Sequence, residues 1–540
     1  MASRLSSLKH LGPYSRFKWG LYWGFVLHLG VCSAVLAEIW GCVFACLLFL
    51  LLIKFLNEVW WNPIRVQRAL RAGGIKGPSY NFFHGNSKEI VKLGKEAMAT
   101  SMELSDHQLF YKVQPHFYLW TKQYGKNFVQ WLGPKPQLIV TDTHLAKQIL
   151  YDQELYPKPE FESYVKRMFG DGLVATKGDK WNSQRKLANH AFHGDNLKGM
   201  IPAMISSLEI MLERWGKNEG KEIEVYQEFK LLTSEIISRT AFSSSYLEGQ
   251  HIFEMLGKLT HLLFKNGYKI RLPIIKDLFK TDDEIESEKL EQGMKNCILE
   301  MVKKREEEAN GNTESYGNDY LGVLMKKNKE AEKISIQDIV DECKTFYIAG
   351  HETTTSALTW TMFLLSIHTD WQHKARNEVL HLFGSTTPTS EDIPKLKIMS
   401  MIVNETLRLY APISNLARQV EKGSRLGKLQ APSRMDILIP PLSIHHDPEI
   451  WGEDADIFKP ERFAEGVAKA TNNNIAAFVP FGLGPRNCVG MNFAMAEIKL
   501  ALSMILQRYT FTLSPNYVHS PIVIFGICPM NGLQINFQPL

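Results

Sequence analysis

A glycine-rich loop that presents one cysteine is the part of the sequence best suited to chemistry. It runs from Phe481 to Gly490 with the sequence FGLGPRNCVG, and an apolar helical run follows from Met491 to Leu506. Glycine adopts backbone angles that other residues avoid, so such a loop lets the main chain approach a flat ligand closely. Cys488 lies near the start of the helix, where the helix dipole favours a thiolate over a thiol. These features predict that Cys488 is a metal ligand.

Arg486 places a fixed positive charge two residues before Cys488, which suits an anionic group such as a carboxylate. The alternative is a Gly/Pro turn that carries a small buried cysteine and binds nothing. The spacing Phe-x-x-Gly-x-Arg-x-Cys-x-Gly is restrictive, and it resembles the haem-binding loop of cytochrome P450 enzymes, whose cysteine thiolate ligates the haem iron. The resemblance implies haem b as the cofactor, with Cys488 as the iron ligand and Phe481 and Arg486 beside the haem.

Trp181 and Arg185 are four residues apart, which places an indole N–H and a guanidinium on one face of a predicted helix. Alone, they could mark an ordinary amphipathic helix. In the P450 family a similar pair binds haem propionates, and Arg418 lies where relatives place another propionate-binding arginine. The resemblance implies that these residues, with Arg486, neutralise two carboxylates, whose burial without partners costs several kcal/mol.

Glu405 and Arg408 lie one turn apart in an apolar helical stretch, Met399 to Tyr410. A surface ion pair at this spacing is the alternative and contributes only about 0.2 to 0.5 kcal/mol. The apolar flanks indicate a buried pair, which needs further hydrogen bonds, and Arg462 is the natural third member. The set resembles the Glu-Arg-Arg network of the P450 family, so we expect a structural role for all three.

A long helical pattern runs from about Ser335 to His368 and begins with an N-cap arrangement of Ser335 and Asp338. Its middle reads AGHETTT over residues 349 to 355. Glycine followed by β-branched threonines predicts a local distortion, since a threonine hydroxyl can bond back to a helix carbonyl. A kink driven only by packing is the alternative to a functional role.

The AGHETTT stretch resembles the P450 motif Ala/Gly-Gly-x-Asp/Glu-Thr-Thr, which lies across the distal face of the haem. The resemblance implies that Gly350 opens room above the haem and that Glu352 and Thr353 are catalytic. Cleavage of O2 needs two protons delivered under control, and a carboxyl group relayed by a hydroxyl and water suits that task. We therefore expect a monooxygenase that inserts one atom of O2 into a hydrophobic small molecule.

Two other functions remain open from the residues alone. One is a haem-binding sensor or carrier without oxygenation, and the other is a haem-thiolate isomerase or dehydratase of peroxides. Both are disfavoured by the presence of Glu352 and Thr353. The loop Gly482-Leu483-Gly484 is followed by proline, so the chain has no dinucleotide fingerprint there. The resemblance implies electrons from NADPH through a separate NADPH-cytochrome P450 reductase, with cytochrome b5 as a further candidate partner.

Composition excludes some partners and favours a compartment. The chain of 540 residues has 62 basic and 57 acidic residues, and its formal charge of +5 makes no case for nucleic acid as a partner. The small positive charge is compatible with an acidic redox partner or an anionic membrane surface. Seven cysteines without CxxC pairs favour a reducing compartment.

The N-terminal region from Trp19 to Ile53 is apolar apart from three residues, and about 20 such residues span a bilayer. Ile39 to Ile53 is the best candidate span, and Trp19 to Ala37 is either a second span or an extension. A cleaved signal peptide is the alternative, but the apolar stretch is too long for one. We expect residues 1–60 to form a retained anchor in the endoplasmic reticulum membrane, with the catalytic domain in the cytosol.

Residues 61–78 are predicted to form a basic Pro/Gly linker, in which regular structure breaks after Pro63, and residues 79–540 the haem-thiolate catalytic domain. Two apolar runs, Phe128 to Gly133 and Pro136 to Thr141, predict a strand pair in an otherwise mainly helical fold. The P450 resemblance implies the same fold class, mainly α with a small β-rich part and the haem between the long helix and the Cys488 loop.

The entry to the catalytic domain, Trp60-Trp61-x-Pro and then Gly-Ile-x-Gly-Pro-x-Tyr, resembles plant P450s of the seventy-two clan. Relatives there act on terpenoids, gibberellins, brassinosteroids and fatty-acid-like molecules, so the substrate is expected among terpenoids, plant hormones or fatty-acid-like compounds. The candidate pocket segments are Tyr164 to Leu173, Leu256 to Tyr268, Phe346 to Ala349, Ile413 to Leu416 and Val523 to Ile527.

Overall fold

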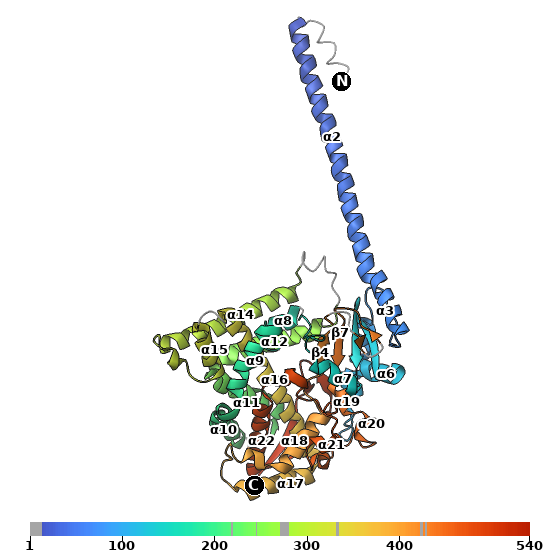
Figure 1. Ribbon diagram of the computed structural model, residues 1–540. Helices are drawn as coiled ribbons and strands as arrows, with labels where there is room; N and C mark the ends of the chain where they lie inside the picture. Colours follow the sequence, from blue (N-terminus) through green and yellow to red (C-terminus); the bar gives the residue numbers. More distant parts are fainter. Residues whose placement is uncertain are drawn as a thin grey trace. The chain divides into compact units, whose positions relative to one another are not determined.

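The computed structural model describes residues 13–161, 163–217, 220–244, 246–269, 280–330, 334–421, 425–426 and 429–540. The chain divides into two units, Met1–Arg65 and Val66–Leu540. Figure 1 shows one long helix in the first unit and many packed helices with small sheets in the second.

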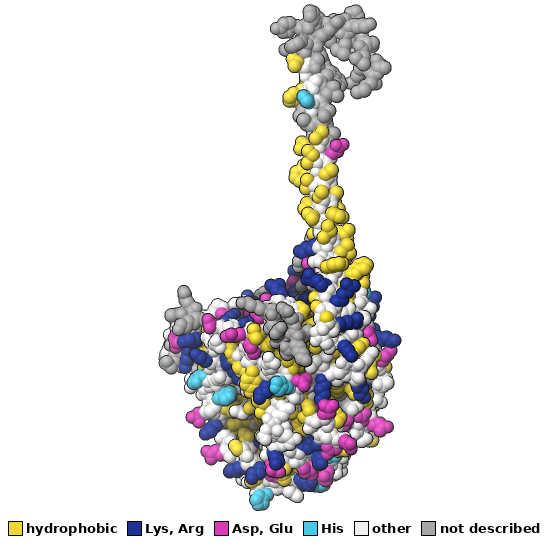
Figure 2. Space-filling view, turned by 45° about the vertical axis from the view of Figure 1, so that its right-hand side comes forward, with side chains coloured by type: hydrophobic (Ala, Val, Ile, Leu, Met, Phe, Trp, Pro, Cys, Tyr) yellow, Lys and Arg dark blue, Asp and Glu magenta, His cyan; other side chains and the backbone are white. Residues whose placement is uncertain are grey.

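The first unit contains one continuous helix, α2 (Pro13–Leu56), followed by one π-helical turn, η2 (Asn57–Trp61). Figure 2 shows hydrophobic side chains along one face of the described part of α2. Within the described part of the chain, one helical stretch, Val35–Ala72, is long and apolar enough to cross a membrane. Both apolar blocks of the predicted anchor lie in α2, whereas residues 1–12 lie outside the described residues.

We predicted that regular structure breaks after Pro63, and this prediction is wrong for the first part of the linker. Residues Asn62–Ala72 form an amphipathic helix, α3. Pro63 follows directly on the π-helical turn η2, where Asn62 donates its N–H to the carbonyl of Asn57, and the helical stretch Val35–Ala72 continues through the proline. The helix also buries Leu70 completely in an apolar cluster with β-strand residues such as Leu138. The chain leaves helical structure only at Gly73.

The second unit is mainly helical, as predicted. Its α-helices are α4 (Ser87–Met98), α5 (Leu109–Val113), α6 (Pro115–Tyr124), α7 (Thr143–Tyr151), α8 (Ser163–Phe169), α9 (Gly178–Phe192), α10 (Gly194–Gly216), α11 (Val225–Phe242), α12 (Tyr246–Asn266), α14 (Asp282–Glu308), α15 (Tyr320–Lys329), α16 (Ile336–Ile367), α17 (Thr369–Phe383), α18 (Lys397–Leu409), α19 (Pro441–His445), α20 (Pro448–Trp451), α21 (Val467–Ala470) and α22 (Met491–Arg508). Short 3-10 turns are η3 (Thr313–Tyr316), η4 (Ile393–Lys395), η5 (Pro460–Phe463) and η6 (Gly484–Arg486).

Four small sheets account for the strands. The first has the order β1-β2-β7-β4, the second β3-β11-β8, and β9-β10 and β5-β6 form pairs. Their bounds are β1 (Asn127–Leu132), β2 (Lys135–Val140), β3 (Glu222–Glu224), β4 (Leu416–Gln419), β5 (Arg425–Leu426), β6 (Leu429–Gln430), β7 (Asp436–Ile439), β8 (Tyr509–Leu513), β9 (Pro521–Val523), β10 (Ile527–Pro529) and β11 (Gln534–Pro539). The predicted strand pair is confirmed, because β1 and β2 pair antiparallel.

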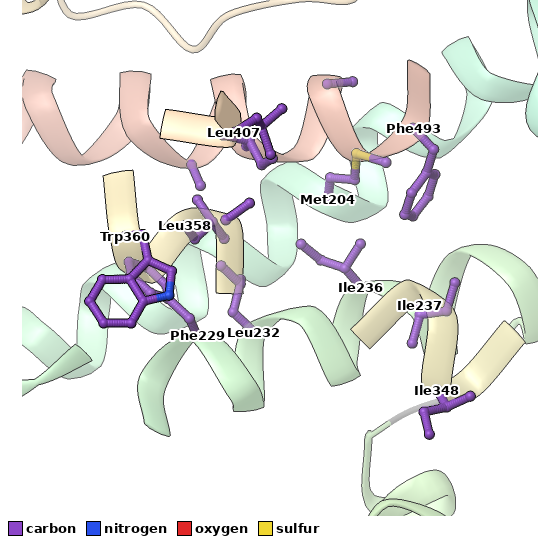
Figure 3. Packing of buried hydrophobic residues seen from close by; sticks show 14 of the residues in the cluster. Met204, Phe229, Leu232, Ile236, Ile237, Ile348, Leu358, Trp360, Leu407 and Phe493 are labelled. Atoms are coloured by element: carbon purple, nitrogen blue, oxygen red, sulfur yellow. The ribbon is translucent and has the colours of Figure 1, made fainter. Parts of the chain in front are cut away.

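Helix α16 lies at the centre of the largest core cluster and packs on α11, α18 and α22. Figure 3 shows buried side chains from these helices and from α10, among them Met204, Ile237, Leu358, Leu407 and Phe493. Full burial of such a side chain contributes roughly 1.5 to 3 kcal/mol. The helix that carries the AGHETTT stretch is therefore a rigid part of the core.

The predicted limits of this helix and its N-cap are confirmed, but the predicted distortion is not observed. Ser335 and Asp338 form a reciprocal capping box at the start of α16. The helix then continues through residues 349 to 355 without interruption. Its threonine hydroxyls donate to carbonyls four residues earlier, as Thr353 does to Ala349 at 2.7 Å, so they are satisfied without breaking the helix.

Candidate active site

The Cys488 loop is held by a hydrogen bond within its own backbone and by close packing on helix α7. The Cys488 N–H donates to the carbonyl of Phe481 at 2.8 Å. Gly482 and Gly484 have φ of 72° and 76°, angles that favour glycine. A Cβ on Gly484 would lie 2.7 Å from the carbonyl oxygen of Leu150 in α7. The glycines are thus required for the turn itself and for its contact with α7.

Cys488 lies just before α22, which has Gly490 as its N-cap residue. Its side chain is exposed, although desolvation by the surrounding protein raises the pKa of its thiol. A hydrogen bond from Gly490 and the charge of Arg185 act in the opposite direction. The ring of Phe481 packs against the main core cluster. The sulfur is therefore accessible to a ligand, and Gly490 and Arg185 only partly offset the desolvation that favours its thiol form.

The three predicted residues Trp181, Arg185 and Arg486 come together around this loop. The Arg486 guanidinium lies 4.2 Å from the centre of the Trp181 ring and donates to the carbonyl of Thr176 at 2.5 Å. Arg185 donates to the carbonyl and side-chain oxygens of Asn487, at 2.6 and 2.8 Å. Helix α9 therefore supplies one arginine that holds the loop backbone next to Cys488.

Arg418 lies in β4 and is 3 % exposed, and among the described residues its guanidinium donates only to the neighbouring carbonyl of Ala417. Burial lowers the pKa of Arg418 to about 10. Burial, together with the charges of Arg418 and Arg185, lowers the pKa of Arg486 to about 9. Within the described residues, none of the ion pairs involves these three arginines. Three guanidinium groups converge without a carboxylate.

Lys158 is a fourth cation of this group that the sequence did not reveal. Burial lowers the pKa of Lys158 to about 7, with further contributions from the charges of Arg418 and Arg486. The residue reaches them because Pro157 accepts a backbone hydrogen bond from Gln419, beside β4, at 2.9 Å. No motif or spacing marks Lys158, since its place depends on pairing between distant segments.

Glu405 and Arg408 form a fully buried ion pair, as the sequence predicted. Both side chains are 0 % exposed, and two hydrogen bonds of 2.7 and 2.8 Å join them. Arg408 also donates to the carbonyls of His445 and Ala455. Arg462 is the third member, with its Nε 3.4 Å from Glu405 Oε1. Every charge of this network faces an opposite charge or a backbone dipole.

His445 connects this network to the Cys488 loop. Its Nε2 accepts a hydrogen bond from the N–H of Val479 at 3.0 Å, so its Nδ1 carries the proton and donates to the carbonyl of Arg408. The carbonyl of Val479 in turn accepts from Gly482 in the loop. The three network residues thus position the loop, and no spacing pattern in the sequence predicted His445 as the connection.

On α16, the carboxylate of Glu352 is 14 % exposed and lies 3.6 Å from the ammonium of Lys230 in α11. Thr353 is half-buried one residue later. The predicted space at Gly350 has a different neighbour, because a Cβ there would lie 2.7 Å from Ile237 Cδ1. Gly350 is therefore needed for close packing of α16 on α11.

Comparison with known proteins identifies the family of this chain. The Cytochrome P450 family model matches residues 105–531. The chain belongs to the cytochrome P450 family. Cytochrome P450 CYP749A22 of Panax ginseng is 54 % identical over 504 residues, covering 92 % of this chain and 96 % of that protein. The 11-oxo-beta-amyrin 30-oxidase of Glycyrrhiza uralensis is 39 % identical, covering 90 % of this chain and 94 % of that protein.

The P450 fold is also found by structural comparison. The retinoic acid bound cyanobacterial CYP120A1 matches with a TM-score of 0.70 at 24 % identity, over 81 % of this chain and 98 % of that one. The protein is thus a P450 haem-thiolate monooxygenase of hydrophobic substrates, with plant relatives that include Cytochrome P450 72A397 of Kalopanax septemlobus at 39 % identity, over 90 % of this chain and 95 % of that protein. This family assignment argues against a sensor, a carrier or an isomerase.

The residues present fit the P450 haem. Haem in this family brings an iron that takes a cysteine thiolate, together with two carboxylates. Cys488 supplies an accessible sulfur, and the four converging cations lack a carboxylate partner among the described residues. Cys488 would therefore suit the iron of the cofactor, and the cations would suit its carboxylates.

Three of the five predicted pocket segments are joined by direct contacts, and α16 adjoins one of them. Thr345 of α16 donates to the carbonyl of Phe169 at 2.9 Å, and the rings of Phe169 and Phe525 lie 5.7 Å apart. Ile413 forms a bridge with Gly526. Residues from Tyr164–Leu173, α16, Ile413–Leu416 and Val523–Ile527 therefore adjoin one another.

The other parts of the predicted pocket lie elsewhere. Phe346 stacks on Phe192 at 5.0 Å inside the core. In the segment from Leu256 to Tyr268, Tyr268 lines a surface pocket of about 520 Å³ together with His84 and Asp283. Three of the predicted segments therefore meet, whereas Phe346 and Tyr268 have other surroundings, and the substrate pocket itself stays a prediction.

Proposed function

We propose that Cys488 provides the thiolate ligand of haem b and that Trp181, Phe481 and three arginines hold the cofactor, the arginines being Arg185, Arg418 and Arg486. The observation that carries this proposal is a group of three guanidiniums that have no carboxylate partner among the described residues, beside an accessible cysteine. Lys158 extends the group by a fourth cation. Glu405, Arg408 and Arg462 act as a structural network, because their charges are already satisfied.

Glu352 and Thr353 are the residues that we assign to proton delivery. Bound haem supplies the activation of O2 and the insertion of one oxygen atom into a C–H bond. The Glu352 carboxyl can take a proton and release it, and the Thr353 hydroxyl, which donates to the Ala349 carbonyl, can turn to hand a proton onward. Lys230 holds the carboxyl in place from α11.

Electrons are proposed to come from NADPH through NADPH-cytochrome P450 reductase, with cytochrome b5 as an additional donor. Residues 1–60 are proposed as the membrane anchor, 61–78 as the connection and 79–540 as the catalytic domain. The apolar helix α2 supports the anchor, and we place it in the endoplasmic reticulum with the catalytic domain in the cytosol. The reduced state of the cysteines suits that side of the membrane.

The substrate is proposed to be a terpenoid. A relative of 39 % identity is named as an 11-oxo-beta-amyrin oxidase. The pocket segments contribute aromatic rings, since Phe161, Phe169 and Phe525 form a chain with centroid distances of 5.9 and 5.7 Å. Such a wall binds rigid apolar rings without ordering a flexible ligand. A plant hormone or a fatty-acid-like molecule is the alternative within the same chemistry.

Replacement of the cysteine tests the haem ligand. Cys488→His is expected to abolish the thiolate-type spectrum of the ferrous carbon monoxide complex while leaving some haem bound. Cys297→Ala, a change at a half-buried cysteine in α14, is the matched control and should leave the spectrum unchanged. An unaltered spectrum in Cys488→His would contradict the assignment.

Thr353→Ala tests proton delivery. The variant should keep a normal carbon monoxide spectrum and continue to consume NADPH with reductase, because the hydroxyl matters after O2 binds. The fraction of electrons lost as hydrogen peroxide should rise, because general acid catalysis contributes about 10²- to 10⁴-fold to the rate of proton transfer. Lower haem content with unchanged peroxide yield would instead indicate a packing role for Thr353.

A further inference from the structure

Helices α11 and α16 share a buried polar cluster that the proposed function does not use. His351 of α16 is 6 % exposed. Its Nδ1 lies 2.8 Å from Thr233 Oγ1 and 3.2 Å from Ser234 Oγ, both on α11. Thr355, one turn further along α16, lies 2.8 Å from the same Thr233 oxygen. The ring of Phe253 from α12 meets His351 edge to face at 5.2 Å.

The partners of the hydroxyl groups determine which nitrogen of His351 carries the proton. Ser234 donates its proton to the carbonyl of Lys230 at 2.6 Å, and Thr233 donates its one proton to the carbonyl of Phe229 at 2.9 Å or to the hydroxyl oxygen of Thr355 at 2.8 Å. Thr355 donates to the carbonyl of His351 itself at 3.0 Å. Both α11 hydroxyls therefore present lone pairs to Nδ1. An N–H at Nδ1 satisfies both oxygens, whereas an unprotonated Nδ1 would face at least one lone pair.

The other nitrogen of the ring faces Glu352. Burial lowers the pKa of His351 to about 4, so the ring is neutral at physiological pH and carries one proton, on Nδ1. The unprotonated Nε2 lies 3.6 Å from Glu352 Oε1. The ammonium of Lys230 lies 3.6 Å from the same oxygen. A lone pair and a positive charge thus meet one carboxyl oxygen.

We propose that His351 is a positioning residue for Glu352, held by Thr233 and Ser234 in the tautomer that turns an unprotonated nitrogen toward the carboxyl. At 3.6 Å the lone pair of this nitrogen lies just beyond hydrogen-bond distance and repels an ionised carboxylate, whereas the ammonium of Lys230 attracts it. The two neighbours act in opposite directions on one group. This inference rests on the proposed role of Glu352 in proton delivery, since it explains how that carboxyl is able both to take and to release a proton.

The other titratable groups near Glu352 do not change the opposite effects of His351 and Lys230 on its carboxyl group. Tyr226 of α11 and Cys528 of β10 lie close enough to interact with its charge. Desolvation raises the pKa of both groups, so both are neutral at physiological pH. Lys230 and His351 are the neighbours whose replacement should change the proton affinity of Glu352 most.

Infrared difference spectroscopy of the full-length holoprotein tests the proposal without a substrate. Photolysis of bound carbon monoxide perturbs nearby carboxyl groups, and the C=O stretch of protonated Glu352 is assigned by its loss in Glu352→Gln. The intensity of this band against pH reports the proton affinity of Glu352. Hydrogen peroxide formed per NADPH, measured with reductase over the same pH range, reports proton delivery.

Opposite shifts are expected for the two neighbours. His351→Phe removes this lone pair and should lower the proton affinity of Glu352 about 10-fold, whereas Lys230→Met should raise it about 10-fold. Thr233→Val combined with Ser234→Ala frees the ring to turn an N–H toward the carboxyl, so it should shift the affinity in the same direction as His351→Phe. Thr361→Val removes a buried α16 hydroxyl that donates only within its own helix, and it should leave the band unchanged.

The outcomes separate this inference from the proposed function. Unchanged proton affinity in folded His351→Phe, or shifts of one sign in both His351→Phe and Lys230→Met, would overturn the inference. Opposite shifts of the band with no change in peroxide yield at any pH would support the role of His351 and refute proton delivery by Glu352. Opposite shifts with a matching displacement of the peroxide profile support both.

Discussion

Arg408 and Arg418 are both buried in the catalytic unit, yet their surroundings differ in charge. Arg408 is 0 % exposed, forms two hydrogen bonds with the Glu405 carboxylate and donates to carbonyls of two further segments. Arg418 is 3 % exposed, and in the described part of the chain it donates only to the carbonyl of Ala417. Its charged neighbours are Arg486 and Lys158, which carry the same sign.

This difference separates a structural site from a ligand site. Burial of a charge costs several kcal/mol unless it is paired. At Arg408 the protein supplies the pair itself, so the site is complete without a cofactor. At Arg418 the protein has placed like charges together, which is unfavourable until an anion arrives. The two haem carboxylates are the anion that a P450 brings to such a group.

The largest expected effect on stability is at the ion pair of Glu405 and Arg408. Glu405→Gln leaves the Arg408 charge buried without its carboxylate, so the free energy of unfolding should fall by about 3 to 5 kcal/mol. Urea unfolding followed by circular dichroism measures this loss. The surface pair Lys92 and Glu96 provides the control, because Glu96→Gln should change stability by less than about 0.5 kcal/mol.

A double variant sharpens the same side of the comparison. Glu405→Leu with Arg408→Met removes both charges, and should recover part of the stability lost in Glu405→Gln. Recovery is expected to be incomplete, since the carbonyls of His445 and Ala455 lose their donor. A double variant less stable than the single one would show that these backbone hydrogen bonds, rather than the ion pair, dominate the site.

Replacement of Arg418 should change the affinity for haem much more than the stability of the fold. Arg418→Met removes a charge that only Ala417 accepts from, so the haem-free protein should be as stable as wild type or more stable. Haem affinity should fall about 10- to 100-fold, the value of a lost hydrogen bond to a charged group. The rate of haem transfer to apomyoglobin measures it. Loss of folding with unchanged haem retention would make Arg418 structural, like Arg408.

Lys158 should give the smallest effect and a pH dependence of defined sign. Its pKa is about 7 in the folded haem-free protein and about 10.4 when unfolded. Between these values the unfolded chain binds more protons, so this group makes stability rise with pH from about 7 to about 10. Lys158→Met should flatten that part of the profile of unfolding free energy. An unchanged slope would mean that Lys158 is not close to the arginines.

Much of this fold follows from local sequence rules. The N-cap residues Ser335 and Asp338, the strand pair β1 and β2, and the apolar length of α2 were all predictable from nearby residues. Pro63 misled the prediction, because the helical stretch Val35–Ala72 continues through it, directly after the π-helical turn Asn57–Trp61. The threonines after Gly350 misled it as well, since core packing of α16 outweighs their weak helix propensity.

By itself the sequence determined which residues can carry the chemistry. Cys488 with its glycines, Glu352 with Thr353, and the Glu405-Arg408 spacing are short patterns whose geometry is set within one turn or one loop. Tertiary structure alone decided which charges remain without a partner and which nitrogen His351 presents to Glu352. Arg418, Lys158 and Arg486 are far apart in the chain, and Thr233 and His351 lie on different helices. Coulomb energy and hydrogen-bond geometry depend on distances in space, which no single stretch of sequence contains.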